Sequence, residues 1–300
     1  MRLLVSGASG LIGSALVRVA RSDGDEVLRL VRRKTSADDE VSWDPAQGTG
    51  PDPRAIEGID AVVHLGGAGV GDHRWTDAYK RELAASRVDS TRVLANTLAA
   101  LEHKPRVFLS GSAVGYYGDT ADTEVDENSP AGKDFLAQLC VEWEAASAPA
   151  AEAGIRTICM RSGIVLSTRG GALGKVLPLF RAGLGGRLGS GKQYISWVAR
   201  PDHVAAMRFL LNADDVHGAV NLTAPTPVTN SAYTKAIAAT VRRPALFAAP
   251  SSALKIALGQ FAETVLTGQR VLPTRLQAAG FEFGYPEVEG ALRALVESNA

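Results

Sequence analysis

Hydrophobic residues are grouped along the chain in short runs that alternate with helical patterns. The first eighteen residues show this most clearly, because an apolar run is followed by three glycines and then by apolar residues at helical spacing. The positions are Leu3, Leu4 and Val5 in the run, Gly7, Gly10 and Gly13 in the turn, and Leu11, Ile12, Ala15, Leu16 and Val19 after it. The order predicts a buried parallel strand, a tight turn and an amphipathic helix.

A glycine-rich turn between a strand and a helix is typical of dinucleotide-binding sites. Glycines let the backbone approach a pyrophosphate, whose charge lies against the free N–H groups at the start of the helix. The spacing here is Gly-x-x-Gly-x-x-Gly. We therefore expect cofactor contacts from Gly7, Ser9, Gly10, Leu11, Ile12 and Gly13. A plain strand–helix turn is the alternative.

The remaining pattern extends this arrangement to the rest of the chain. Strands are predicted at residues 26–31, 41–45, 58–69, 106–110, 157–160, 219–222 and 280–285, and helices at 75–101, from 176 onward and at 231–241. The alternation predicts an α/β fold, a Rossmann-like doubly wound parallel sheet with a smaller α/β C-terminal substrate lobe. Residues 1–165 and 200–224 would form the cofactor domain. Residues 166–199 and 225–300 would form the lobe, including a small C-terminal domain at about 248–300.

Basic residues stand at the end of the second predicted strand, where an NAD-binding protein usually carries a carboxylate for the ribose 2′-hydroxyl. Arg32, Arg33 and Lys34 occupy this place. Guanidinium forks match a 2′-phosphate in geometry and charge. We therefore expect Arg32 and Arg33 to bind NADP(H) in preference to NAD(H). The alternative is that the Arg32-Arg33-Lys34 run is a solvated strand end.

Other candidate cofactor contacts follow the predicted strands. Small residues end the strand at 58–69, so Leu65, Gly66, Gly67 and Ala68 can lie close to the cofactor. His64, within that strand, is expected to be a packed core residue. Arg87 on the following helix can face the cofactor or form a surface ion pair. Ser110 and Arg161, at the ends of two later strands, complete the predicted cofactor set.

A serine and two tyrosines follow the strand at 106–110. Because ligands bind outside the carboxyl ends of the strands in open α/β sheets, Ser112, Tyr116 and Tyr117 are the catalytic candidates. A serine hydroxyl can orient a substrate, and a tyrosine can supply a proton if its pKa is lowered from about 10. A glycine-rich loop packed with aromatic side chains is the alternative.

These motifs together resemble the extended short-chain dehydrogenase/reductase superfamily, of the nucleoside-diphosphate-sugar epimerase type. The likeness lies in the glycine turn, in Asp60-Ala-Val-Val-His-Leu65, in Ser112-Ala-Val-Gly-Tyr-Tyr-Gly118, in Arg161-Ser-Gly-Ile-Val-Leu166 and in Asp202-His-Val204. More narrowly, Trp143-Glu144, residues 189–197, 221–230 and 268–273 look like an atypical "epimerase family protein" branch with a small C-terminal domain. If the likeness holds, Gln193, Tyr194 and Trp197 line the substrate side. Arg181 and Lys192, among loop glycines, can clamp an anionic substrate or be merely solvated.

The chain departs from the superfamily at one important motif. Active members pair the serine with Tyr-x-x-x-Lys on the next helix, and here Phe135 and Leu139 take the expected places. Neither can donate or acidify a proton. Three interpretations remain: an NADP(H)-linked reductase with Tyr116 or Tyr117 as replacement acid, an NADP(H)-binding sensor or regulatory module without turnover, and an epimerase-like protein with a cycling or structural cofactor. The substrate would be a small hydroxy- or carbonyl-bearing metabolite, such as a sugar derivative.

The composition of the chain limits which ligands, metals and membranes we expect it to bind. Lys plus Arg equals Asp plus Glu at 32 each, so no global field attracts nucleic acid or an acidic membrane. Cys140 and Cys159 have no metal-ligand or disulfide spacing, and we expect reduced, buried thiols and no metal. The chain enters its first strand without a signal-like segment, and no apolar run has the length of a membrane span. We expect a cytoplasmic protein, monomeric or homodimeric.

Overall fold

A seven-stranded parallel sheet forms the centre of the molecule. The computed structural model describes residues 1–297, and its main sheet has the order β12-β7-β5-β4-β1-β2-β3. The strands are β1 (Arg2–Ser6), β2 (Glu26–Val31), β3 (Glu40–Ser42), β4 (Ala61–His64), β5 (Val107–Ala113), β7 (Arg156–Ser162) and β12 (Gly218–Leu222). The predicted Rossmann-like α/β fold is confirmed. The strand β5 runs three residues further than expected, so Ser112 lies in the sheet.

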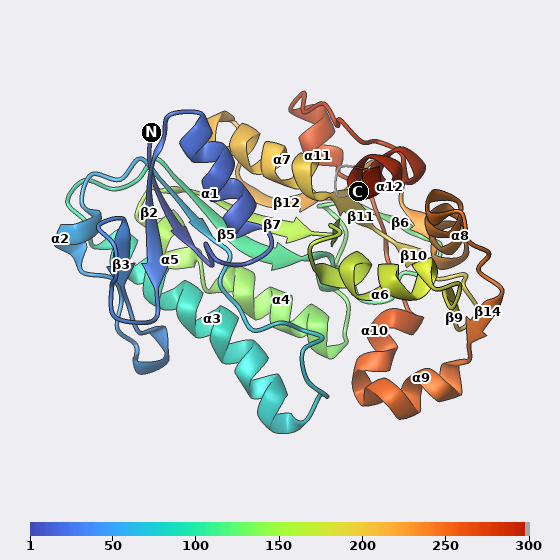
Figure 1. The fold of residues 1–300 in the computed structure, drawn as a ribbon. Coiled ribbons are helices and arrows are strands. Elements are labelled where there is room, and N and C mark those ends of the chain that lie inside the picture. The colour runs from blue at the N-terminus through green and yellow to red at the C-terminus, as the bar shows by residue number, and fades with distance from the viewer. Residues whose placement is uncertain (298–300) are drawn as a thin grey trace.

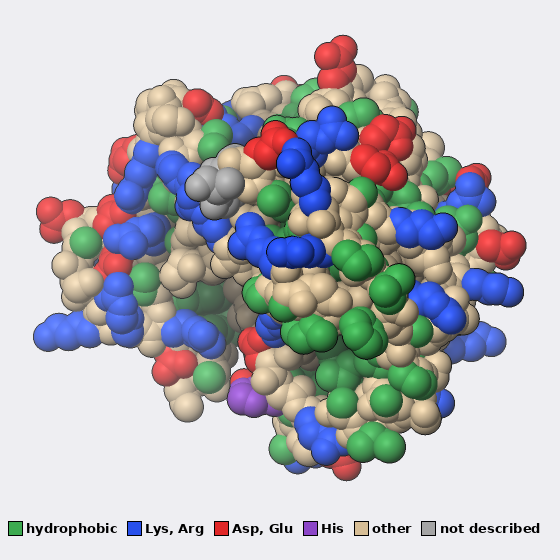
Figure 2. Space-filling view, turned by 45° about the vertical axis from the view of Figure 1, so that its right-hand side comes forward, with side chains coloured by type: hydrophobic (Ala, Val, Ile, Leu, Met, Phe, Trp, Pro, Cys, Tyr) green, Lys and Arg blue, Asp and Glu red, His purple; other side chains and the backbone are tan. Residues whose placement is uncertain are grey.

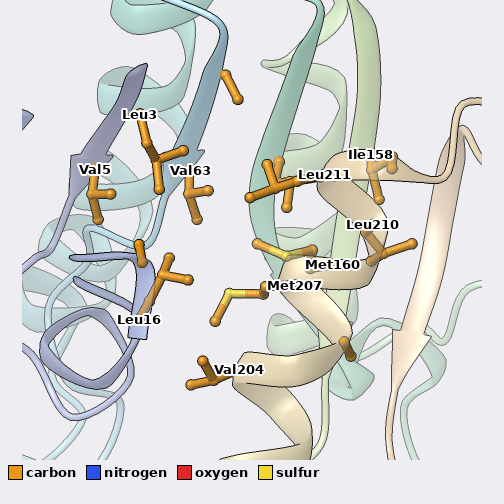
Figure 3. Packing of buried hydrophobic residues seen from close by; sticks show 14 of the residues in the cluster. Leu3, Val5, Leu16, Val63, Ile158, Met160, Val204, Met207, Leu210 and Leu211 are labelled. Atoms are coloured by element: carbon orange, nitrogen blue, oxygen red, sulfur yellow. The ribbon is translucent and has the colours of Figure 1, made fainter. Parts of the chain in front are cut away.

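Helices cover both faces of this sheet (Figure 1). On one face α1 (Gly13–Ser22), α7 (Arg200–Asn212) and α11 (Thr274–Ala278) pack over a core that includes Leu16, Met207 and Leu276. Figure 3 shows Leu16 from α1 and Met207 from α7 in this core, together with Val63 on a strand of the sheet. On the other face lie α3 (Asp77–Ala99), α4 (Phe135–Ala145) and α5 (Ala148–Glu152), with α2 (Pro53–Ile56) and η1 (Pro45–Gln47) near the sheet edge.

The C-terminal lobe is built from short elements at the carboxyl ends of the strands. Its helices are α6 (Gly171–Arg181), α8 (Asn230–Val241), α9 (Ser251–Leu258), η3 (Gly259–Phe261), α10 (Ala262–Leu266) and α12 (Val288–Glu297). Two-stranded pairs join β8 (Ile164–Leu166) to β11 (Trp197–Ala199), β9 (Gly186–Leu188) to β14 (Phe247–Ala249), β10 (Tyr194–Ile195) to β13 (Val228–Thr229), and β6 (Glu124–Val125) to β15 (Arg270–Val271). Helices α6, α8 and α12 share one apolar core.

The surface of this lobe carries exposed apolar side chains. Leu246, Phe247 and Ile256 are among them, and Figure 2 shows hydrophobic side chains gathered on this side of the molecule. No helix within residues 1–297 has the length and apolar content needed to cross a membrane.

The strand predicted at residues 280–285 is wrong, because this aromatic segment finds no strand to pair with. The ring of Phe281 instead packs on Phe209 and Phe283, and the Asp202 carboxylate accepts hydrogen bonds from the Gly284 and Tyr285 amides. Phe281 therefore belongs to the core under α7.

Candidate active site

A cavity of about 360 Å³ connects the glycine turn to the carboxyl ends of β5 and β7. Its wall is mostly apolar, and its polar side chains include Arg87, Ser112 and Ser162. The lining residues are Gly7, Gly10, Leu11, Ile12, Gly13, Leu65, Val70, Arg87, Gly111, Ser112, Ala113, Gly115, Leu136, Leu139, Cys140, Trp143, Ser162, Gly163 and Val165. Six predicted cofactor residues in the turn and after β4 therefore lie on one surface with Ser112.

The turn itself is shaped so that only glycine fits at two positions. Gly7 has φ 68°, and a Cβ there would lie 2.8 Å from the carbonyl carbon of Leu65. A Cβ on Gly13 would collide with the Gly7 carbonyl oxygen. The first turn of α1 has no acidic residue and no side-chain cap, so its free N–H groups and dipole are left for an anion. This cradle fits a cofactor pyrophosphate. Ser9 lies exposed at the tip of the turn.

The two arginines after β2 have different surroundings. The Arg33 guanidinium donates to both carboxylate oxygens of Glu40, at 2.8 and 2.6 Å. Arg32 is exposed, and its side chain has no hydrogen bond or ion pair with any residue in 1–297. A 2′-phosphate would thus meet Arg32 without competition, whereas Arg33 already has a carboxylate partner.

The ion pair of Glu40 with Arg33 should make the stability of the folded protein depend on pH. Hydrogen bonds from Arg33 lower its pKa from 4.5 to about 2, so the ionised form stabilises the fold above the unfolded-state pKa. That stabilisation is lost as pH falls from about 4.5 to about 2. Glu40→Gln should therefore flatten the acid side of the stability profile in this window, as measured by urea unfolding at several pH values. An unchanged profile would contradict the contribution of Glu40.

Arg87 is a buried cation at the cavity wall. The side chain is 8% exposed, its Nη2 donates to the Ala68 carbonyl at 2.8 Å, and its guanidinium lies 5.2 Å from the Trp143 ring centroid. Burial lowers its pKa, and no carboxylate within residues 1–297 pairs with it. A buried guanidinium without a counter-ion suits an anionic ligand such as a cofactor phosphate. Gly67 and Ala68 support this arginine and do not line the cavity.

Ser112 belongs to a buried chain of charged and polar groups. Its Oγ donates to Glu144 Oε1 at 2.7 Å, and Arg161 holds the same carboxylate through Nε at 2.8 Å and Nη2 at 2.9 Å. Arg161 is predicted from the sequence to bind the cofactor, but its position does not favour this role. Its guanidinium is engaged by Glu144, and the residue does not line the cavity. Glu144 was not among the predicted site residues. The Trp-Glu motif at 143–144 was the only signal for it.

The two predicted catalytic tyrosines lie behind this chain rather than on the cavity wall. The Tyr117 hydroxyl accepts from Arg161 Nη1 at 3.0 Å and donates to Asn221 Oδ1 at 2.7 Å. Burial raises the pKa of Tyr117 to about 12, which makes it a poor acid. The Tyr116 ring faces the Arg161 guanidinium, 3.3 Å from its centroid. Ser110 is fully buried and also lies off the cavity.

Helix α4 presents apolar residues and a thiol to the cavity. Leu136 and Cys140, four residues apart, line it together with Leu139 and Trp143, whereas Phe135 packs against the Trp75 ring. Phe135 thus lies off the cavity wall and Leu139 lies on it, and α4 contains no tyrosine or lysine at any position. Burial raises the pKa of the Cys140 thiol to about 12. Cys140 and Cys159 are both buried and free, as predicted.

The five predicted substrate residues do not line this cavity. Trp197 is fully buried in the lobe core, with its indole N–H donating to the Thr226 carbonyl, so it is a packing residue. Gln193 is buried and donates to the Leu188 and Val265 carbonyls. Arg181 and Lys192 are exposed, and the ring of Tyr194 is covered by Arg270. His64 is a core residue, as predicted, between the hydroxyls of Ser6 and Ser90.

Comparison with known families agrees with this geometry. A family model described as "NAD dependent epimerase/dehydratase family" matches residues 3–249. The chain belongs to this family. A second family model, described as a domain of unknown function (DUF1731), matches residues 249–295. The resemblance to short-chain dehydrogenase/reductase epimerases is thereby confirmed.

Similar members of the family cover almost the whole chain. Epimerase family protein Mb2239 of Mycobacterium bovis is 45% identical over 289 residues, 96% of this chain and 95% of that protein. Human epimerase family protein SDR39U1 is 35% identical over 300 residues, 99% of this chain and 100% of its own length. The crystal structure of human SDR39U1 (isoform 2) with NADPH matches with a TM-score of 0.92 at 33% identity and covers 99% of both chains.

Proposed function

We propose that the protein binds NADP(H) and uses it in an oxidoreductase or epimerase-like reaction on a small hydroxy- or carbonyl-bearing metabolite, such as a sugar derivative. One observation carries this proposal: a single cavity joins the glycine cradle to the Ser112 hydroxyl, with the unpaired Arg87 cation in its wall. The NADPH complex of the human relative supports the choice of cofactor, and the partner-free Arg32 supports NADP(H) over NAD(H).

The hydrogen bonds around Ser112 define what it can do. The Glu144 carboxylate accepts from Arg161 and from Ser112 Oγ, so the Ser112 proton points to Glu144. The lone pairs of Ser112 Oγ are then free to accept from a substrate hydroxyl. That hydroxyl can pass its proton to Ser112 while Ser112 passes its own to Glu144. A bound nicotinamide supplies or accepts the hydride. Arg161 and Glu144 hold the serine in this orientation.

A non-catalytic NADP(H)-binding sensor or regulatory module is the second candidate. The observation that favours it is the absence of a ready proton donor: α4 carries no tyrosine or lysine, and the Tyr117 phenol is engaged by Asn221. Such a cavity can hold a cofactor without turnover.

Calorimetric titration with NADPH and NADH, followed by turnover assays, tests the two candidates. NADPH oxidation would be followed against a panel of carbonyl compounds, and NADP⁺ reduction against a panel of hydroxy compounds. Tight NADPH binding with turnover supports the enzyme. Tight binding without turnover in either direction supports the sensor, and no binding of either nucleotide would contradict both.

Ser112→Ala should abolish turnover, because it removes the group placed to accept the substrate proton. A positioned proton-transfer group typically contributes about 10²–10⁴-fold in rate. NADPH affinity should remain nearly unchanged. Tyr116→Phe is the matched control, because Tyr116 is also a catalytic candidate from the sequence. Loss of turnover in this variant would assign the proton to Tyr116, and full activity in Ser112→Ala would remove Ser112 from the mechanism.

Arg32→Ala should weaken NADPH binding by about tenfold or more and leave NADH binding unchanged, since a charge-assisted hydrogen bond contributes about 1.5–3 kcal/mol. Arg33→Ala should have the smaller effect on NADPH, because its fork is held by Glu40. Calorimetric titration measures the affinity of each variant for NADPH and for NADH. Equal losses for NADPH and NADH in the Arg32 variant would exclude a 2′-phosphate contact.

A further inference from the structure

A second serine at the cavity has an unusual partner. Ser162 ends β7 and lines the cavity, and its Oγ lies 2.8 Å from Nε2 of His203 on α7. His203 is 0% exposed, and its Nδ1 has no hydrogen-bond partner among residues 1–297. The cofactor cradle and the Ser112 chain make no use of this histidine.

The protonation state of His203 follows from its surroundings. Burial lowers its pKa to about 4, so the imidazole is neutral near neutral pH and carries one N–H. A proton on Nδ1 would be a buried donor without an acceptor, which costs about 1–3 kcal/mol. A proton on Nε2 is satisfied by Ser162 Oγ and leaves only an acceptor lone pair unpaired. The Nε2–H tautomer is therefore the stable one.

The tautomer determines the direction of the serine hydroxyl. If His203 Nε2 donates to Ser162 Oγ, the Ser162 proton cannot point back to the histidine and is free to point into the cavity. Ser112 has the opposite arrangement, because its proton is committed to Glu144. In the β5–β7 register Ser112 lies beside Arg161 and Ala113 beside Ser162, so the Ser112 side chain points to the α4 face of the sheet and the Ser162 side chain to the α7 face. Both serines line the cavity at the carboxyl ends of these strands.

We infer that Ser162, oriented by His203, is a hydrogen-bond donor for a carbonyl oxygen bound in the cavity. Ser112 lines the same cavity from the adjacent strand and accepts, and Ser162 therefore supplies the complementary donor. The carbonyl can belong to the nicotinamide carboxamide or to the substrate. The inference rests on the proposed function for the source of this carbonyl, whereas the direction of the hydrogen bond rests on the protein alone. His203 is a positioning residue because it acts through Ser162.

The first test measures the tautomer directly. Heteronuclear NMR of the imidazole nitrogens, with the His203 signals assigned by their loss in His203→Gln, should show the proton on Nε2. A proton on Nδ1 would overturn the inference, whatever the protein binds.

The second test asks what the donor binds. NADPH and adenosine 2′,5′-bisphosphate, which lacks the nicotinamide, are titrated into the unaltered protein, Ser162→Ala, His203→Leu and His203→Gln. If the carboxamide is the acceptor, Ser162→Ala and His203→Leu weaken NADPH binding about threefold to tenfold and spare the bisphosphate. His203→Gln, whose amide can still donate to Ser162, retains most of the affinity.

If the substrate carbonyl is the acceptor, NADPH affinity is unchanged and the KM of the carbonyl compound turned over in the panel rises by the same factor in Ser162→Ala. Unchanged NADPH affinity without a rise in KM, including the case of no turnover, would overturn the inference. Failure of the proposed function looks different, because the unaltered protein would then bind no NADPH.

Discussion

Replacing Arg161 with methionine is expected to lower the free energy of unfolding by about 3–5 kcal/mol, the range for removing one partner of a buried ion pair. Arg161 is the cation that neutralises Glu144, whose side chain is only 15% exposed. The same guanidinium donates to Tyr117 and covers the Tyr116 ring. Without it, the Glu144 carboxylate keeps only the Ser112 hydroxyl as a donor, and the Tyr117 oxygen loses the donor that Arg161 provides.

Urea unfolding of Arg161→Met measures this loss, with Arg92→Met as the matched control. Arg92 pairs with Asp89 on the surface of α3, where both side chains are 55% exposed, so its replacement should cost less than about 1 kcal/mol. The double variant Arg161→Met, Glu144→Leu should recover much of the stability, because no unpaired charge remains. A similar small loss for Arg161 and Arg92 would show that the buried pair contributes no more than a surface pair.

Gly7→Ala is expected to reduce NADPH affinity at least tenfold, equivalent to about 1.4 kcal/mol. The added Cβ would lie 2.8 Å from the Leu65 carbonyl, so the turn must move away from β4 and out of its phosphate-binding shape. The positive φ of 68° adds backbone strain of about 1 kcal/mol to the cost in stability.

Gly48→Ala serves as the control that separates the effect of backbone strain at a positive φ from the effect of the Cβ collision with Leu65. Gly48 has φ 69°, a Cβ added there would meet no atom within 4 Å beyond its chain neighbours, and the residue lies away from the cavity. This variant should lose about 1 kcal/mol of stability and bind NADPH normally. Calorimetry and urea unfolding of both variants give the comparison. Normal NADPH affinity in Gly7→Ala would exclude the turn as the cofactor cradle.

The elements that sequence predicts well are those specified by local pattern. The run at Leu3–Val5 and the glycines after it fix β1, the turn and α1, because burial and chain reversal there depend on neighbouring residues. The aromatic alternation at 280–285 was misleading for the opposite reason. A strand needs a partner edge, and the Asp202 carboxylate, about eighty residues earlier, takes the amides that a strand would offer.

The roles of individual side chains were harder to predict than the helices and strands, because these roles too depend on partners elsewhere in the chain. Arg161 and Tyr117 have the right chemistry for cofactor binding and acid catalysis, but Glu144 and Asn221 engage them. These partners come from a helix and a strand distant in sequence, and no periodic pattern indicates the pairing. The Arg33–Glu40 pair is closer in sequence, yet an exposed basic run looks the same with or without it.

The position of the C-terminal residues in the core has a consequence for how the chain folds. The two family models meet at residue 249, but Leu276 and Phe281 pack beneath α7 on the main sheet, and α12 completes the core around α8. A chain truncated at the junction would therefore leave apolar surface of both cores open to water. The junction between the two family models is therefore not the boundary of an independently folding unit. The segment after residue 249 folds together with the rest of the chain and cannot be exchanged on its own.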